Sequence, residues 1–298
     1  MTESSKPAWR MLQAGQTSEL VVANAQTGAN EVIYSTPDLI EAPNWTPDGQ
    51  WLVFNQEGRL FRLSTHGGVP ELIDTGSIDR LNNDHVLSPD GETVFVSNGD
   101  GHLYRVAIDG GEPARVSNDH PGRAYRYYLH GVSPDGKELA YVGLEMMDGK
   151  PVTWICTIPA AGGKDKMLTD GACPVDGPEY SPDGEWIYFN SEAAASQPGH
   201  AQLFRMSRDG SGTQQLTFDD RVNWFPHLSP DGSRLVYISY PAGTIGHPAD
   251  KQVIIRSMDP NGGGPADLDS FNGGQGTINV NSWAPDSFHF AYVRYPQA

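Results

Sequence analysis

A turn that occurs six times is the feature that most constrains the fold of this chain. The motif is Ser, Thr or Ala followed by Pro-Asp and then Gly or Ser, as in SPDG. Its prolines are Pro47, Pro89, Pro134, Pro182, Pro230 and Pro285, spaced 42 to 55 positions apart. A period of about 40 to 50 residues is typical of propeller blades. The repeat therefore predicts a propeller or a similar array of small units.

Each repeat reads as a hairpin followed by two more strands. Proline presets the first corner of the turn, and glycine supplies the positive φ that returns the chain. A β-rich run follows each turn, for example residues 186–189, WIYF. A third run such as QLFRMS then leads to a Gly-containing turn and a short fourth run such as QQLTF. The pattern predicts four antiparallel strands per unit and an all-β protein.

The sixth repeat is incomplete, and the missing strands are found at the other end of the chain. After Pro285 the sequence offers only HFAYV, whereas residues 18–24 and 31–35 read SELVVAN and EVIYS. We therefore expect N-terminal strands to complete the last blade, which leaves no long open sheet edge. The prediction is one domain, 1–298, forming a six-bladed β-propeller. Its expected blades are 38–75, 79–117, 124–169, 174–217, 222–270, and 276–295 together with 18–36.

These repeats resemble the C-terminal propeller of TolB. The resemblance rests on the six Pro-Asp turns, each preceded by an aromatic or aliphatic residue and followed by a strand and a Gly-Gly type turn, over roughly residues 18 to 295. It implies a propeller that binds a ligand or a protein. The oligogalacturonate lyases are similar at a greater distance. That second resemblance implies a divalent metal held by three His and one Gln.

Composition narrows the range of partners. The chain has 20 basic and 37 acidic residues and a net charge of −17, whereas a surface that binds phosphates needs the opposite sign. We expect a small molecule, a carbohydrate or a protein as partner, and no nucleic acid. No apolar run approaches the length of a membrane span. The N-terminus lacks a secretory signal, which predicts a cytoplasmic protein, or a periplasmic one if a leader has been removed.

The loops between blades, and those joining second to third strands, should share one face of the disc. They are longer than the Pro-Asp turns, and loops held by a rigid scaffold commonly carry function. The first strand of each blade should be innermost, so residues entering it should converge on the mouth of the central channel. His85, His130 and His227 lie three or four positions before a repeat proline. We expect a site at this mouth.

Two readings of the three histidines are open. They could hold Mn²⁺ or Zn²⁺, because imidazole suits both metals, although His227 is one residue out of phase with the other two. Alternatively each imidazole donates to a loop carbonyl and joins neighbouring blades. The other candidate ligand-binding residues are Asp84, Arg126, Asp176, Glu179, Trp224, His247 and Asn281.

Two functions follow from these readings. The first is a propeller that binds a ligand or protein at the mouth without chemistry. The alternative is a metal-dependent lyase acting on uronate-type oligosaccharides, in which Arg126 neutralises the substrate carboxylate and Glu179 or Tyr128 moves the proton. The chain has no G-x-S-x-G, no H-E-x-x-H and no Gly-rich phosphate loop, so other common enzyme classes are disfavoured.

Overall fold

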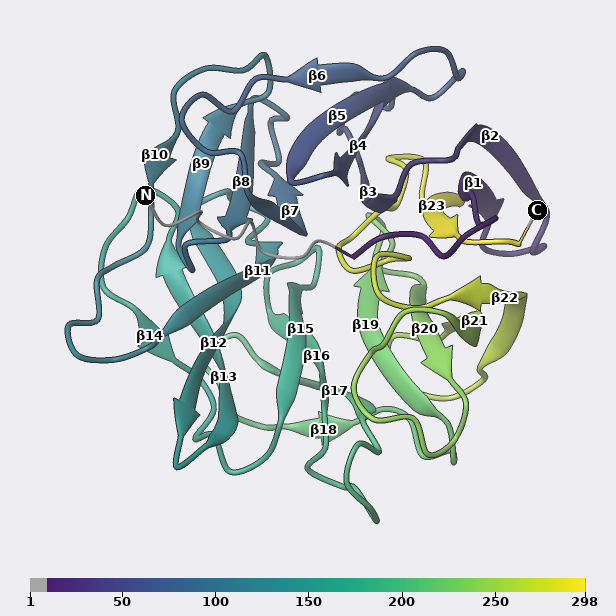
Figure 1. Cartoon of the computed structure of the whole chain (residues 1–298). Helices are drawn as coiled ribbons and strands as arrows, with labels where there is room; N and C mark the ends of the chain where they lie inside the picture. The colour runs from purple at the N-terminus through teal and green to yellow at the C-terminus, as the bar shows by residue number, and fades with distance from the viewer. Residues whose placement is uncertain (1–9, 298) are drawn as a thin grey trace.

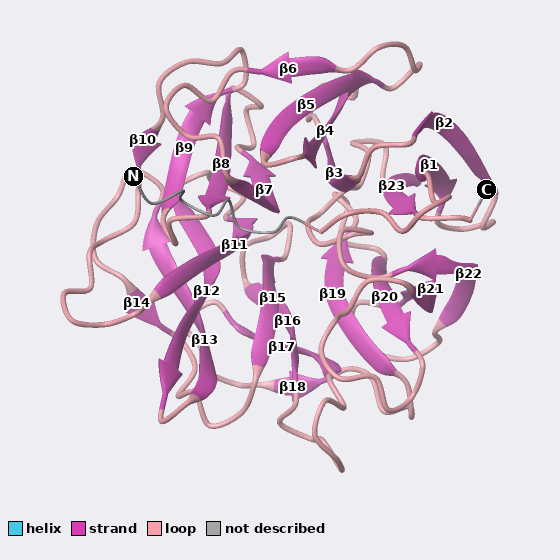
Figure 2. Ribbon diagram, viewed as in Figure 1, coloured by secondary structure: helices cyan, strands magenta, loops and turns pink. Residues whose placement is uncertain are grey.

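The computed structural model describes residues 10–297. All regular structure in this range is β, and Figure 2 shows strands and loops without helices. Six sheets are arranged around a central axis (Figure 1), which confirms the predicted six-bladed propeller. No helix within residues 10–297 could span a membrane.

Five of the sheets have four antiparallel strands in sequence order. The first is β3 (Ile40–Trp45), β4 (Trp51–Gln56), β5 (Arg59–Ser64) and β6 (Glu71–Ile73); the second is β7 (Leu81–Leu87), β8 (Thr93–Asn98), β9 (Leu103–Ala107) and β10 (Ala114–Arg115). The third is β11 (Arg126–Val132), β12 (Glu138–Met147), β13 (Lys150–Pro159) and β14 (Lys166–Met167). The fourth is β15 (Val175–Tyr180), β16 (Trp186–Ser191), β17 (Gln202–Ser207) and β18 (Gln214–Gln215); the fifth is β19 (Val222–Leu228), β20 (Leu235–Tyr240), β21 (Lys251–Met258) and β22 (Ala266–Gly273).

The repeated turn is held by its own side chains. In the third copy Ser133 Oγ donates to Asp135 Oδ1 at 2.6 Å, and the amide of Gly136 donates to the carbonyl of Ser133 at 2.8 Å. Gly136 has a φ of 70°, a conformation that costs glycine little. The same serine–aspartate bond recurs at Ser229 and Asp231. Each turn thus fixes the register of the hairpin that it closes.

The sixth sheet joins the two ends of the chain. Strand β1 (Ser18–Asn24) pairs with β23 (His289–Arg294) from Glu19↔Arg294 to Asn24↔His289, and β2 (Asn30–Thr36) lies on the outside. The fourth strand expected here is reduced to one bridge, Trp283↔Phe290. The preceding stretch, 274–282, forms hydrogen bonds within itself, to β23 and to blade one, for example from the amide of Val293 to the carbonyl of Thr277 at 2.9 Å and from the amide of Ala42 to the carbonyl of Gly276 at 2.7 Å.

Every innermost strand is irregular where it nears the channel mouth. The register shifts within β3, β7, β11, β15 and β19. In three of them the residue five positions before the repeat proline takes a left-handed conformation: Ala42 (φ 53°), Gly177 (φ 62°) and Phe225 (φ 55°). β-Bulges re-aim the side chains next to them. They therefore decide which residues face the mouth.

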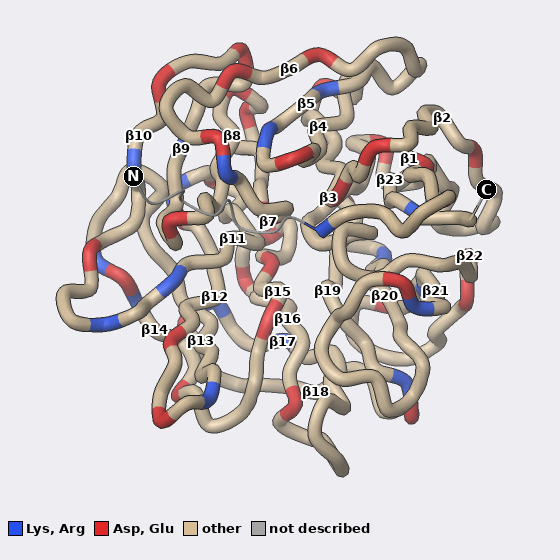
Figure 3. Tube along the Cα trace, viewed as in Figure 1, with Lys and Arg blue, Asp and Glu red and all other residues tan. Residues whose placement is uncertain are grey.

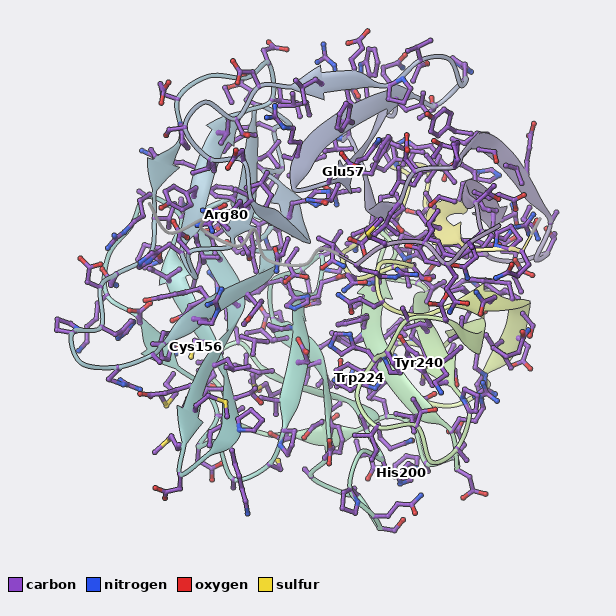
Figure 4. The ribbon with its side chains drawn as sticks, viewed as in Figure 1. Glu57, Arg80, Cys156, His200, Trp224 and Tyr240 are labelled. Carbon is purple, nitrogen blue, oxygen red and sulfur yellow. The ribbon has the colours of Figure 1, made fainter. Side chains whose placement is uncertain are left out.

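The blades pack against one another through apolar side chains. Leu20, Leu52 and Val293 are fully buried together at the closure. Figure 4 labels Trp224 and Tyr240 in the blade that contains β19 and β20, and both are buried there. Charged positions are spread around the disc with acidic and basic ones interspersed (Figure 3). Such a rigid ring holds its loops in fixed positions.

Candidate functional site

A cavity of about 400 Å³ opens where the innermost strands begin, on the face of the inter-blade loops. Its lining comes from blades two to five and from the loop before β23. The lining residues are Asn82, Asn83, Asp84, Tyr128, His130, Val142, Leu144, Thr153, Asp176, Phe225, His247, Gln275 and Asn279. The volume lies within the range of small-ligand pockets. Four of the predicted ligand-binding residues, together with Tyr128, meet in this cavity.

Asp84 is the most buried carboxylate of the cavity, with 5% of its surface exposed. Its Oδ2 accepts from Asn82 Nδ2 at 2.5 Å, and no lysine or arginine within the described chain forms an ion pair with it. Burial raises the pKa of the Asp84 carboxyl; the charge of His130 opposes this effect, and that of Asp176 adds to it. The group is therefore a buried acceptor whose negative charge is only partly compensated.

His130 and Asp176 form the charged centre of the cavity. His130 Nε2 lies 3.0 Å from Asp176 Oδ1, and His130 Nδ1 lies 3.2 Å from the carbonyl oxygen of Asn279. Both ring nitrogens thus face acceptors, which favours the imidazolium. Burial alone would lower the pKa of His130, but Asp84 and Asp176 outweigh it and raise the pKa to about 9. Burial likewise opposes ionisation of Asp176, yet the bond from His130 lowers its pKa below the usual value.

Aromatic rings and a second histidine support this centre from blade five. Phe225 lies parallel to the His130 ring with centroids 5.6 Å apart, and His247 packs on Trp224 at 4.6 Å. His247 Nε2 is 3.7 Å from Asp176 Oδ2, and its Nδ1 contacts the side-chain oxygen of Gln275. Trp224 itself is buried in the core. Its ring contacts those of His247 and Phe225.

The segment that precedes β1 reaches the same mouth. In Figure 1 the described part of this segment, 10–17, begins near the centre of the disc beside β3 and runs outward to β1. Arg10 Nη1 lies 3.4 Å from Glu41 Oε1 and also contacts the carbonyl oxygen of Gln275. Its guanidinium stacks over the ring of Tyr295, with Cζ 4.1 Å from the centroid. The mouth therefore already accommodates one cation supplied by the chain itself.

Two predicted residues face the opposite end of the channel instead. Glu179 and Asn281 line a smaller pocket of about 200 Å³ beside the Pro-Asp turns. Glu179 Oε2 lies 2.6 Å from His227 Nδ1, while its Oε1 accepts from the amide of Leu228 at 2.9 Å and from Asn281 Nδ2 at 2.7 Å. This network connects blades four, five and six.

The three histidines do not share a site. His85 Nε2 faces the carbonyl of Val53 at 3.4 Å, and His227 Nε2 faces that of Ile278 at 3.0 Å. His130 faces Asn279 as described above. Each imidazole therefore contacts a different backbone carbonyl, as in the blade-joining interpretation. Among residues 10–297 no group of three His, Cys, Asp or Glu side chains is arranged to hold a metal. These residues do not fit the metal centre that the lyase resemblance implies.

Arg126 lies outside the cavity. It is exposed in a neighbouring groove between blades two and three, and its Nη2 donates to the carbonyl of Gly99 at 2.9 Å. Half of the eight cavity residues that the sequence interpretation did not single out carry amide side chains: Asn82, Asn83, Gln275 and Asn279. They lie in the two inter-blade segments that were already expected to border the mouth. Polar side chains next to a predicted innermost strand were the sequence signal that could have identified them as cavity residues.

The architecture places this chain among the six-bladed β-propellers, a fold in which function depends on the individual site and not on the arrangement of blades. The model of the TolB beta propeller domain matches residues 131–298, and the chain belongs to that family. An uncharacterized protein of Agrobacterium fabrum is 41% identical over 93% of this chain and 92% of its own length.

A solved structure from Agrobacterium tumefaciens, provisionally assigned as TolB, is 39% identical, with a TM-score of 0.86 over 97% of this chain and all of that one. TolB of the Tol-Pal system of Francisella tularensis is 22% identical over 92% of this chain, which spans only 61% of that relative. An oligogalacturonate lyase in complex with manganese has a TM-score of 0.58 at 19% identity, covering 86% of this chain and 74% of its own. The last likeness concerns the fold alone.

Proposed function

We propose that this protein is a binding module that takes a ligand or a segment of a partner protein into the mouth cavity and performs no chemistry on it. The observation that carries the proposal is the cluster of buried Asp84 and His130 with the partly exposed Asp176, supplied by three different blades. Buried charges are costly to assemble. Their convergence at an open cavity is better accounted for by recognition than by stability.

The catalytic alternative receives less support from the geometry. Its three proposed metal ligands point to three separate carbonyls, Arg126 lies outside the cavity, and Glu179 is engaged by three donors towards the other end of the channel. The similarity to TolB of the Tol-Pal system favours a protein as the partner.

Site-specific photo-crosslinking in the native host would test the proposal. A benzophenone amino acid replaces Leu144, which is half-buried in the cavity wall, or Glu112, which is exposed far from it in the turn between β9 and β10. We expect a defined adduct from position 144 and not from position 112. The adduct should also disappear when Thr153 is replaced by Trp to fill the cavity. Equal labelling from both positions, or adducts indifferent to the filled cavity, would contradict a binding site at the mouth.

A further inference from the structure

Within the described chain the carboxylate of Asp84 has no cationic partner at ion-pair distance, although the charge of His130 acts on it from further away. Asp176 is engaged by His130 at 3.0 Å and lies near His247, whereas Asp84 accepts one amide bond from Asn82. Its Oδ1 has no hydrogen-bond partner in the described chain and is not among the fully occluded polar atoms. This oxygen therefore faces the open cavity from a residue that is 5% exposed.

The cavity lining contains carboxylates but no lysine or arginine. Asp84 and Asp176 are opposed only by the imidazoles of His130 and His247, and the other polar side chains are amides and the hydroxyls of Tyr128 and Thr153. A ligand with one positive charge would give the Asp84 carboxylate a counter-ion and would offset the free-energy cost of burying its charge. An anionic ligand would add a further negative charge. The net charge of −17 also favours the approach of cations over longer distances.

The chain provides its own precedent for cation binding at this mouth. The guanidinium of Arg10 lies on the ring of Tyr295 and pairs with Glu41, and it contacts Gln275, which also lines the cavity. A carboxylate beside an aromatic face is a common setting for arginine. Asp84, next to the His130–Phe225 stack, repeats this combination one blade further round.

The segments that form the cavity also carry exposed apolar side chains. These side chains favour a polypeptide over a small free amine as the ligand. Strands β12 and β13 run ten residues each, beyond the six of most second strands, and carry Met146 and Met147 past Leu144 of the cavity wall. Ile245 is 75% exposed two residues before His247, and Met11 is 80% exposed beside Arg10. Methionine-rich surfaces adapt well to protein partners.

We propose that the cavity receives a lysine or arginine side chain of a polypeptide partner, with the Asp84 carboxylate as its counter-ion and the neighbouring apolar side chains contacting the adjacent residues. The proposal rests on the binding function proposed above and names the chemistry of its ligand. Because the charge on Asp84 is buried, the interaction should discriminate sharply between charged and neutral side chains of similar shape.

Heptapeptide pools test this inference. The central residue is fixed as Arg, Lys, citrulline or Glu, the flanking positions are random, and retention on the immobilised full chain is measured. We expect the Arg and Lys pools to be retained at least about tenfold more strongly than the citrulline and Glu pools. Asp84→Asn should remove this preference. Glu112→Gln, an equal loss of charge at an exposed position in the turn between β9 and β10, should not.

Each other outcome would overturn a defined part of the proposal. Equal retention of all pools that is lost in a cavity-filling Leu144→Trp variant would overturn the cationic ligand and leave the binding site standing. Retention that is the same with and without that variant would overturn both. Arginine amide binding as strongly as the arginine pool would overturn the polypeptide partner. The comparison of the arginine and citrulline pools uses the unmutated protein. It therefore remains a valid test even if the Asp84→Asn variant folds poorly.

Discussion

Replacing Glu179 by Ala should be among the most destabilising single changes in this propeller. The side chain is 6% exposed and accepts from three groups of two other blades: His227 Nδ1 at 2.6 Å, the Leu228 amide at 2.9 Å and Asn281 Nδ2 at 2.7 Å. Each buried donor left without an acceptor costs about 1–3 kcal/mol. Water from the adjacent pocket can satisfy part of this loss, so we expect a decrease in the free energy of unfolding of about 3–5 kcal/mol.

Urea unfolding followed by tryptophan fluorescence and circular dichroism would measure this loss. With an m-value of about 3 kcal/mol per molar urea, the midpoint should fall by roughly 1–2 M. Glu92→Ala is the matched control, because Glu92 is exposed and its side chain makes no hydrogen bond or ion pair within residues 10–297. It should change stability by less than about 0.5 kcal/mol.

A double-mutant cycle separates the network from its parts. If Glu179 and Asn281 act as one unit, the double Ala variant should lose less stability than the sum of the single variants, by about 0.5–3 kcal/mol. The reasoning would be refuted by a loss below about 1 kcal/mol for Glu179→Ala, or by strictly additive single effects. Either result would mean that the blades are held together by their apolar contacts and need no carboxylate between them.

Three further outcomes are expected. Removing residues 10–36 takes away β1 and β2 and exposes the edge of β23, so the variant should aggregate or lose cooperative unfolding; a monomer with unchanged melting on size exclusion and calorimetry would contradict the closure. Burial lowers the pKa of His85 to about 4, so its stabilising contribution, present above pH 6.5, should be lost as the pH falls from 6.5 towards 4. The pKa of His130 is raised to about 9, so its contribution should be lost as the pH rises from 6.5 towards 9, up to about 3 kcal/mol in each case. Melting temperatures measured across this pH range would test both statements. The decrease towards acid pH should be smaller in His85→Leu, and the decrease towards alkaline pH should be smaller in His130→Gln. Finally, Gly177→Ala would place a Cβ 2.9 Å from Phe225 at a φ of 62°, and should lower the free energy of unfolding by about 1–2 kcal/mol and weaken ligand binding, as calorimetry and the peptide assay would show.

The fold could be predicted from sequence because its information is local and repeated. A Pro-Asp-Gly turn needs only its own residues, as the bond from Ser133 to Asp135 shows, and six copies in phase specify the blades. The missing fourth strand of the last blade could not be predicted in this way. Residues 274–282 bond among themselves, as from the amide of Gly276 to Asn279 Oδ1, and also to blade one, where the partner of Gly276 is the sequence-distant Ala42.

The candidate site was predictable in position but not in the direction of its side chains. Alternation along a regular strand would place His85 and His130 on one side and His227 on the other. A bulge in each innermost strand alters this rule locally, so His130 faces Asp176 in the cavity, whereas His85 faces Val53 within the ring. The difference depends on which neighbour offers an acceptor, and that neighbour belongs to another blade.

Side-chain direction at the mouth depends on the neighbouring blade. For this reason residue type predicted the cavity residues better than their spacing from the repeat prolines. Asp84, His130 and Asp176 hold different positions relative to their repeat prolines, yet they meet, because each bulge shifts its strand by a different amount. A charge buried at the inner end of a blade needs a partner from a neighbouring blade, and only His130 and Asp176 lie at ion-pair distance from one another. A ring of near-identical blades acquires a specific site at the point where its repeats cease to be equivalent. We therefore expect that replacing Asp84 by Asn, the residue type at the neighbouring positions 82 and 83, leaves the propeller folded and removes its preference for a cationic ligand.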